Sequence, residues 1–167
     1  MNALFKRRSI RKYKKDRPVE KEKVRKILEA GFAAPSARNT QPYNFLVIDK
    51  RKLLDRIPDA HPYAEMSRQA TMAILVLGEL EKQPNKGYIA QDLSAATENI
   101  LIEATELGLG SVWLGVYPRE ERMKDLRELF NIPDRFMPFS LIIIGYPDEE
   151  KPPSDRYSDK KVFYNKF

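Results

Sequence analysis

The sequence predicts an α+β fold in which a small sheet is flanked by helices, and three observations lead to this prediction. Segments whose apolar residues recur at helical spacing alternate irregularly with short apolar runs typical of strands. One helical segment, residues 87–108, is much longer than the others. No internal repeat or linker divides the 167 residues, a length that fits one domain with a sizeable core. We therefore expect residues 1–167 to form a single domain.

The first helix is expected after a basic N-terminal arm. Apolar residues recur at helical spacing from Val24 to Phe32. Pro18 stands near the start of this segment and Pro35 ends it, and both are places where a helix tolerates proline. A polar loop follows, and residues 44–49 (NFLVID) then form a short strand-like run.

Two short helices and a buried strand are expected next. Residues 51–57 have the character of a short helix, and residues 63–70 that of a second one. The continuous apolar run at residues 72–77 (MAILVL) is typical of a buried strand.

Residues 87–108 give the longest helical pattern. One stripe of this predicted helix is apolar, whereas Asp92 and Glu98 lie off the stripe. Small residues on the helix favour close approach by other elements, which is typical of a central helix, and Gly108 ends it. The stripe consists of Leu93, Ala96, Ile100, Ala104 and Leu107.

The last regular elements are two strands with a helix between them. Residues 111–117 (SVWLGVY) are expected as a strand, and residues 139–147 (FSLIIIGYP) as a buried one. Between them, apolar residues from Met123 to Phe130 mark a helix that begins after Pro118.

The C-terminal residues 148–167 are polar and contain proline, yet they end in Phe163, Tyr164 and Phe167. Aromatic rings gain free energy when they are buried, and a structureless tail of one chain offers them no place. We therefore expect the tail to extend onto a partner subunit.

The positive charge is concentrated in one segment. The sequence has a pI of about 9.4 and a formal net charge of +6, and residues 1–15 hold seven Lys or Arg and no acid. The rest of the chain therefore carries a net charge of −1. A local excess suits one phosphate-bearing ligand at least as well as a long polyanion, which favours a stripe of charge over a whole face. A basic nucleic-acid-binding module remains the alternative.

The composition excludes several chemistries. One histidine and no cysteine leave almost nothing for a zinc site, and no GxSxG motif accompanies the histidine. His61 lies in a turn-like context (DAHPY), where we expect an exposed or locally bonded imidazole. If the protein is an enzyme, a bound cofactor is expected to carry the reactive group. The chain has no long apolar run and no apolar stretch near its start, so we expect a cytoplasmic protein without a membrane span.

The segment RRSIRKY, from Arg7 to Tyr13, is the first candidate for binding a ligand. Extended backbone would place Arg7, Ser9 and Arg11 on one side of the chain and Arg8 on the other. Two guanidinium groups and a hydroxyl match the several oxygens of a phosphate. The alternative is a basic arm that only increases solubility.

The loop APSARNTQPYNF is the second candidate, because Ser36, Arg38, Asn39 and Gln41 lie between two prolines that stiffen it. Asn and Gln offer both donors and acceptors, the pattern that the pyrimidine edge of an isoalloxazine ring presents. The alternative is a turn rich in turn-forming residues.

Gly115 and Arg156 complete the candidates. Gly115 lies inside the strand of GLGSVWLGV, and a glycine there often marks close approach by a ligand or a bulge. A backbone N–H at this position could donate to a ring nitrogen such as flavin N5. Arg156, with Lys151 nearby, is either a further phosphate ligand or a solvated charge of the tail.

The order and spacing of these motifs resemble the nitroreductase superfamily from Lys6 to Tyr164. RRSIRKY is followed by PSARNTQPYNF, a long Ala-rich helix, GLGSVWLG, and an arginine-containing tail. The resemblance implies a small mixed sheet flanked by helices, a homodimer with FMN at the interface, and a tail on the partner subunit. It implies phosphate and ribityl contacts by Arg7, Arg8, Ser9, Arg11 and Arg156, ring contacts by Ser36, Asn39 and Gln41 from the other subunit, and backbone contacts to N5 and O4 by Leu114 and Gly115.

The activity that the resemblance implies is an FMN-dependent NAD(P)H oxidoreductase of the nitroreductase type. NAD(P)H, a transient co-substrate, passes hydride to N5 of tightly bound FMN, and a nitroaromatic, a quinone or a similar acceptor is reduced in a ping-pong cycle. No side chain acts as acid or base, and no metal or nucleic acid takes part. Reductive dehalogenation, enone reduction and flavin fragmentation are the alternatives on this scaffold. Two departures concern the substrate: Tyr43 stands where many members have Trp, and residues 60–88 carry no alignable motif.

Overall fold

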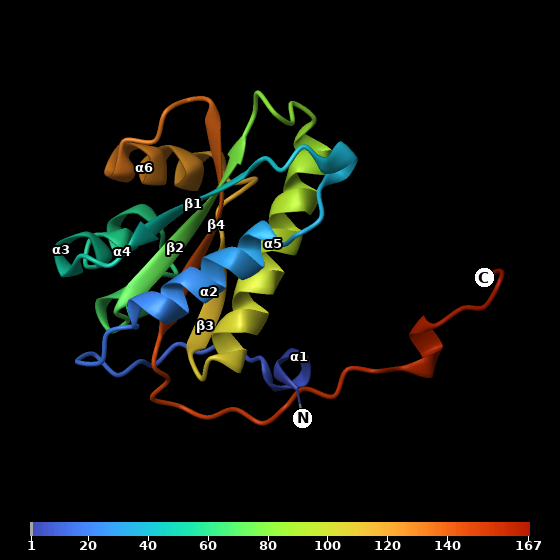
Figure 1. Cartoon of the computed structure of the whole chain (residues 1–167), viewed down its shortest axis with the longest axis horizontal. Coiled ribbons are helices and arrows are strands. Elements are labelled where there is room, and N and C mark those ends of the chain that lie inside the picture. The colour runs from blue at the N-terminus through green and yellow to red at the C-terminus, as the bar shows by residue number, and fades with distance from the viewer. Residues whose placement is uncertain (1) are drawn as a thin grey trace.

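A four-stranded sheet forms the centre of the computed structural model, which describes residues 2–167 (Figure 1). Its strands are β1 (Tyr43–Ile48), β2 (Met72–Glu79), β3 (Gly110–Gly115) and β4 (Phe136–Gly145). They lie in the order β1-β2-β4-β3, so that β1 and β3 are the edge strands.

All neighbouring strands of this sheet are antiparallel. The helix α5 (Lys86–Glu106) connects β2 with β3. These two strands run in the same direction, but they are not neighbours because β4 lies between them. Within residues 2–167, the parallel direction occurs between neighbours only at the isolated bridge of Ser9 with Ser111. The α+β class is confirmed, and the sheet differs from the expected mixed sheet in the direction of its strands.

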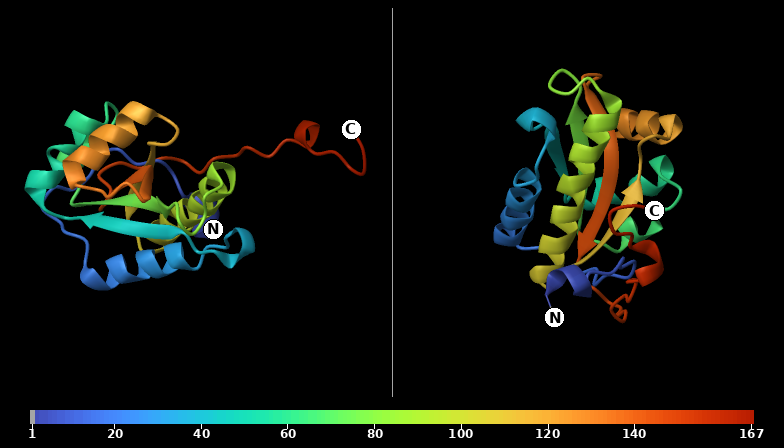
Figure 2. Two further views of the ribbon diagram at one scale, coloured as in Figure 1. Left: turned by 90° about the horizontal axis from the view of Figure 1, so that it is seen from above. Right: turned by 90° about the vertical axis from the view of Figure 1, so that its right-hand side faces the viewer.

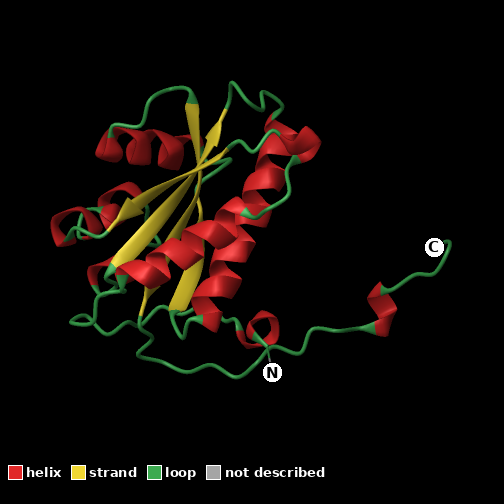
Figure 3. Ribbon diagram, in the orientation of Figure 1, coloured by secondary structure: helices red, strands yellow, loops and turns green. Residues whose placement is uncertain are grey.

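Helices cover both faces of the sheet, as Figures 2 and 3 show. The helices α2 (Lys21–Phe32) and α5 pack on one face. The short helices α3 (Arg51–Leu54) and α4 (Ile57–Ala60) pack with α6 (Glu120–Phe130) on the other. The short helix α1 (Ala3–Lys6) contacts α5. Single 3-10 turns span Ala37–Asn39, Glu65–Arg68 and Asp159–Lys161.

The two helical layers explain the apolar run of β2. Ile74 and Val76 point to the α5 face, whereas Ala73 and Leu75 point to the α4 and α6 face, and all four are fully buried. A strand covered on both faces needs apolar residues at every position. The run therefore shows no alternation of apolar and polar residues.

The expected elements are confirmed apart from the region between β1 and β2. The helix expected over residues 51–57 is two helices, because the chain turns at Arg56 and Pro58 lies in the first turn of α4, where its missing N–H costs nothing. The helix expected over residues 63–70 is only the 3-10 turn Glu65–Arg68.

The helix α5 begins at a capped residue and has a polar group in the core. Asn85 Oδ1 accepts hydrogen bonds from the N–H groups of Gly87 and Tyr88, at 2.9 and 3.2 Å. Asp92 lies off the apolar stripe, yet its side chain is only 5% exposed. The loop that contains Ala37 covers Asp92, so this residue is not on a solvated face. In the described part of the chain, no helix is long and apolar enough to cross a membrane.

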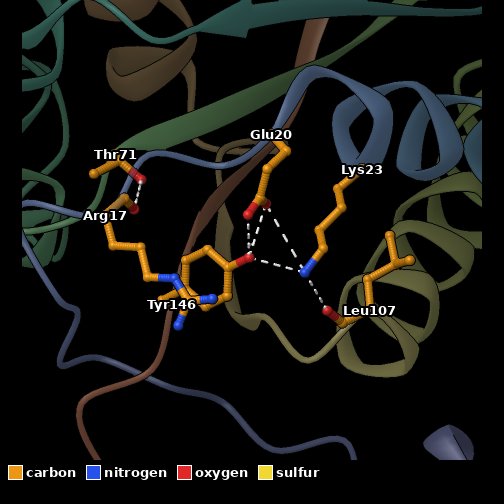
Figure 4. A network of polar contacts seen from close by, with 6 residues as sticks. All are labelled: Arg17, Glu20, Lys23, Thr71, Leu107 and Tyr146. Atoms are coloured by element: carbon orange, nitrogen blue, oxygen red, sulfur yellow. Dashed lines mark hydrogen bonds and ion pairs between the residues drawn. The ribbon is translucent and has the colours of Figure 1, made fainter.

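A polar cluster fastens the start of α2 to the end of β4 (Figure 4). The hydroxyl of Tyr146 donates to the Glu20 carboxylate at 2.7 Å and accepts from Lys23 Nζ at 2.8 Å. Lys23 also donates to the Leu107 carbonyl, and the Arg17 guanidinium lies 3.4 Å above the Tyr146 ring. The Tyr146 hydrogen bond holds the pKa of Glu20 below its usual value. The segment that follows the N-terminal arm is therefore held against the end of β4.

The C-terminal residues 148–167 extend away from the rest of the chain (Figures 1 and 2). Near its start the tail is fastened, because the Asp148 N–H donates to the Lys12 carbonyl at 2.9 Å. Further along, Tyr157, Tyr164 and Phe167 are exposed, Phe167 completely.

Candidate functional site

The N-terminal arm contacts the outer edge of β3 at the start of that strand. Ser9 pairs with Ser111, and the Ile10 N–H donates to the Ser111 carbonyl at 2.9 Å. Ile10 and Tyr13 are buried, and the Tyr13 hydroxyl donates to the Ile10 carbonyl at 2.6 Å. Burial raises the pKa of Tyr13, with a further contribution from the charge of Glu149. Tyr13 thus stays neutral and holds the arm in place.

The arm brings several cations to one place. Lys6, Arg8 and Lys151 line a surface hollow beside Gly108 and Gly110. Lys151 Nζ donates to the Ser9 carbonyl at 2.6 Å, so the start of the tail is part of this hollow.

The arm binds two carboxylates of the same chain, those of Glu149 and Glu98. Glu149 accepts from the Arg11 N–H and lies 3.3 Å from Lys151 Nζ. The Arg11 N–H, and then Lys151, keep the pKa of Glu149 below its usual value. Arg7 turns towards α5, where its Nε lies 3.1 Å from Glu98 Oε1. The arm therefore favours negative charge through its backbone as well as its side chains.

Gly115 lies at the far end of the same strand. In an antiparallel pair the N–H and C=O of a residue point to the same side, and the side alternates along the strand. The Ser111 carbonyl bonds to the arm, so the backbone groups of Trp113 and Gly115 also point away from β4. Gly115 is exposed, and a Cβ atom added there would have no other atom within 4 Å. A flat ligand can therefore approach the backbone of Gly115 from the side where a Cβ atom would stand.

Leu114 has a different position. By the same alternation its backbone groups face β4, and its side chain packs in the core with 6% exposure. Leu114 is thus placed to fix the strand, and Gly115 to present a donor at the open edge.

His61 contacts the backbone of Gly115. Its side chain is 1% exposed, and its Nε2 lies 3.0 Å from the Gly115 carbonyl oxygen. Arg122 Nη1 donates to the same oxygen at 2.8 Å. Burial lowers the pKa of His61, and the charge of Arg122 lowers it further, whereas the bond to Gly115 raises it. The expected local bonding is confirmed, but the imidazole is buried rather than exposed. No local pattern indicates Arg122, because its contact depends on the packing of α6.

The loop of residues 36–41 is held by its own polar groups. Arg38, Asn39 and Gln41 have positive φ angles of 55°, 55° and 48°. Non-glycine residues rarely adopt this conformation, which costs on the order of 1 kcal/mol or more per residue. Ser36 Oγ accepts from the Gln41 N–H at 2.9 Å, and Gln41 Nε2 donates to Asn39 Oδ1 at 2.9 Å. The predicted ring-binding residues are therefore close together in a constrained loop.

This loop and the hollow beside the arm lie at different positions along α5. The loop is bonded to α5 at Asp92, through the Ala37 N–H, whereas the hollow beside the arm includes Thr105. Thirteen residues of helix separate these positions, which corresponds to about 20 Å along the axis. Arg156 is exposed, and its side chain makes no hydrogen bond or ion pair within residues 2–167. The predicted residues thus form three groups: the arm with Gly115, the loop, and the tail arginine.

The family model described as the nitroreductase family matches residues 4–64 and 58–146. A protein of Archaeoglobus fulgidus, provisionally named NADH dehydrogenase/NAD(P)H nitroreductase, is 45% identical over all of this chain and 98% of its own length. Among solved structures, the FMN-dependent nitroreductase of Clostridium difficile R20291 matches with a TM-score of 0.91 at 35% identity, covering 99% of each chain. A Desulfovibrio desulfuricans protein, provisionally described as a nitroreductase and crystallised in complex with FMN, matches with a TM-score of 0.84 at 34% identity, covering 99% of this chain and 95% of that one. The chain belongs to the nitroreductase family.

Proposed function

We propose that this protein is an FMN-dependent oxidoreductase that takes reducing equivalents from NADH or NADPH and passes them to a nitroaromatic, a quinone or a similar acceptor. Bound FMN would supply the hydride chemistry at N5, in a ping-pong cycle in which donor and acceptor use the same place in turn. The names of the related proteins support this proposal, since they include an NAD(P)H nitroreductase and an FMN-dependent nitroreductase.

The observation that carries the proposal is the outer edge of β3. Cations of the arm gather where Ser9 pairs with Ser111, and the unobstructed backbone of Gly115 follows four residues further along the strand. At the rise of a β-strand, four residues correspond to about 13 Å. An elongated ligand with a phosphate at one end and a polar ring at the other, such as FMN, fits this arrangement of charge and donors.

Each group of residues has its own role in the proposal. Arg7, Arg8 and Arg11 hold the phosphate, and Ser9 fixes the arm against β3. Arg7 would exchange its ion pair with Glu98 for the phosphate. The Gly115 N–H orients the ring at the N5 edge, where close approach is possible because no side chain intervenes.

We also propose a homodimer, each subunit a single FMN-binding domain over residues 1–167. The separation of the loop from the hollow beside the arm supports this arrangement, in which Ser36, Asn39 and Gln41 would reach the flavin of a second copy. The exposed aromatic residues of the tail and the exposed Leu4 and Phe5 of α1 also need a partner surface. The tail would bring Arg156 to the phosphate.

The chain's own residues would position the ligands and exclude water, and would not transfer protons. His61 is the only histidine of the sequence, and both of its nitrogens have partners within the protein. The proposed cycle therefore uses no side chain as acid or base.

The test is the visible absorbance spectrum of the purified protein. We expect a yellow protein whose absorbance is bleached by NADH or NADPH without oxygen and restored by an acceptor. A panel of nitroaromatics, quinones, halogenated compounds and enones separates this activity from other flavin reactions. Colourless protein that cannot be reconstituted with FMN would contradict the proposal.

A further inference from the structure

The carbonyl oxygen of Gly115 receives two hydrogen bonds from two different elements. His61, directly after α4, approaches with Nε2 at 3.0 Å, and Arg122 of α6 donates through Nη1 at 2.8 Å. Both elements belong to the layer that covers the opposite face of the sheet from α5. The end of β3 is therefore fastened to this layer through a single peptide oxygen.

The partners of the His61 ring define its protonation. The Gly115 carbonyl can only accept a hydrogen bond, so Nε2 must carry the proton. The Tyr63 N–H can only donate, and it lies 3.3 Å from Nδ1, so Nδ1 must be unprotonated. His61 is therefore a neutral imidazole that donates to Gly115, and a charged imidazole would lose the contact with Tyr63.

Gly115 needs such a constraint because it has no side chain, which is also what lets a ligand approach its backbone. Without a Cβ atom it leaves the edge of β3 open, but it also has more backbone freedom than any other residue. Its N–H belongs to the peptide unit of the Leu114 carbonyl, which faces β4. Its carbonyl belongs to the next peptide unit, whose Val116 N–H donates to the Phe139 carbonyl at 3.2 Å. The two hydrogen bonds from His61 and Arg122 hold the other side of this second peptide unit, and together these contacts limit the φ and ψ angles of Gly115.

We propose that His61 is a positioning residue which, together with Arg122, holds the peptide unit after Gly115 and so fixes the backbone conformation of Gly115 where a flavin ring binds. This inference rests on the proposed function, in which Gly115 contacts the ring. His61 is only 1% exposed, so we expect the ligand to contact Gly115 and not the imidazole. Residues that orient a directly contacting group commonly change affinity or rate by about 10- to 100-fold when they are replaced.

The test compares three variants of the FMN-loaded protein. His61→Leu removes the donor and keeps an apolar side chain of similar size. His61→Gln keeps an N–H donor and serves as the conservative replacement. Ser67→Ala is the matched control, because Ser67 is also fully buried on this face and its hydroxyl also donates to a carbonyl, that of Leu54, at 2.9 Å.

The readouts are the midpoint potential of bound FMN and the rate of its reduction by NADH. With His61→Leu we expect a more negative potential and a rate about tenfold lower, because a misdirected donor stabilises the electron-rich ring less. His61→Gln should restore part of both values. Ser67→Ala should lower the melting temperature and leave the potential unchanged. A His61→Leu protein with the wild-type potential and rate would overturn the inference.

Arg122→Met gives an independent test if His61→Leu does not fold, because Arg122 approaches the same oxygen from the surface of α6. We expect a potential shifted in the same direction, and an unchanged potential would again count against the inference. Failure of the proposed function is distinguishable, since the wild-type protein would then bind no FMN at all.

Discussion

The backbone N–H of Ala37 donates to Asp92 Oδ1 at 2.8 Å, and this bond fastens the loop of residues 36–41 to the central helix α5. The loop is the one that would reach the flavin of a second subunit. The loop contains three positive φ angles and is held by its own hydrogen bonds, and the buried Asp92 adds a bond from outside the loop.

Replacing Asp92 should therefore release the loop. For Asp92→Ala we expect a loss of about 1.5–3 kcal/mol in the free energy of unfolding, because a buried hydrogen bond to a carboxylate is lost. Asp92→Asn keeps an acceptor for Ala37 and should lose less. Urea unfolding measures the difference, and equal stability of Asp92→Ala and the wild type would show that the loop does not depend on this bond.

The phosphate assignment predicts a selective loss of cofactor. Arg7→Ala combined with Arg11→Ala should weaken FMN binding by about 100-fold, because two charge-assisted contacts disappear, while the fold is retained. The matched control is Arg25→Ala with Lys26→Ala, which removes the same charge from exposed positions of α2. Fluorescence titration with FMN measures both. Wild-type affinity in the arm variant would refute the assignment.

The burial of His61 predicts how stability depends on pH. Because its pKa is lowered in the folded protein, the unfolded chain binds the proton more readily. This contribution to stability is complete above the unfolded pKa of about 6.5 and decreases as the pH falls below it, by at most about 1.4 kcal/mol per pH unit. His61→Gln should lack this part of the slope in urea unfolding between pH 5 and pH 8. An identical pH profile for both proteins would mean that His61 is protonated equally in the folded and unfolded states.

The tail prediction concerns assembly. A chain that ends at Lys151 retains the bonds of Glu149 and Lys151 to the arm but lacks the exposed aromatic residues. We expect this truncated protein to form weaker dimers and to bind FMN less tightly, as measured by light scattering and FMN titration at several protein concentrations. A truncated chain that dimerises like the full one would remove the tail from the interface.

The regular elements were predictable because their signals are local. The apolar run of β2 reflects a strand that is buried on both faces. The long apolar stripe of α5 reflects a helix that packs on the sheet with one side. The position of Gly115 in a strand was likewise readable from its neighbours. These features depend on residues that are close together in the sequence.

The remaining features depend on contacts between distant segments. The placement of β4 between β2 and β3 is a long-range pairing that no local pattern specifies. Asp92 has the spacing of a solvated residue, and only the loop from residue 37 buries it. The contact of Arg122 with Gly115 likewise requires α6 to fold back onto the end of β3.

The crystal structure of the FMN complex tests the central claim most directly. We expect the phosphate among Arg7, Arg8 and Arg11, the ring edge at the Gly115 N–H, and the loop of residues 36–41 contributed by a second copy. Arm cations that point to unrelated places, or a flavin bound away from the outer edge of β3, would contradict the account.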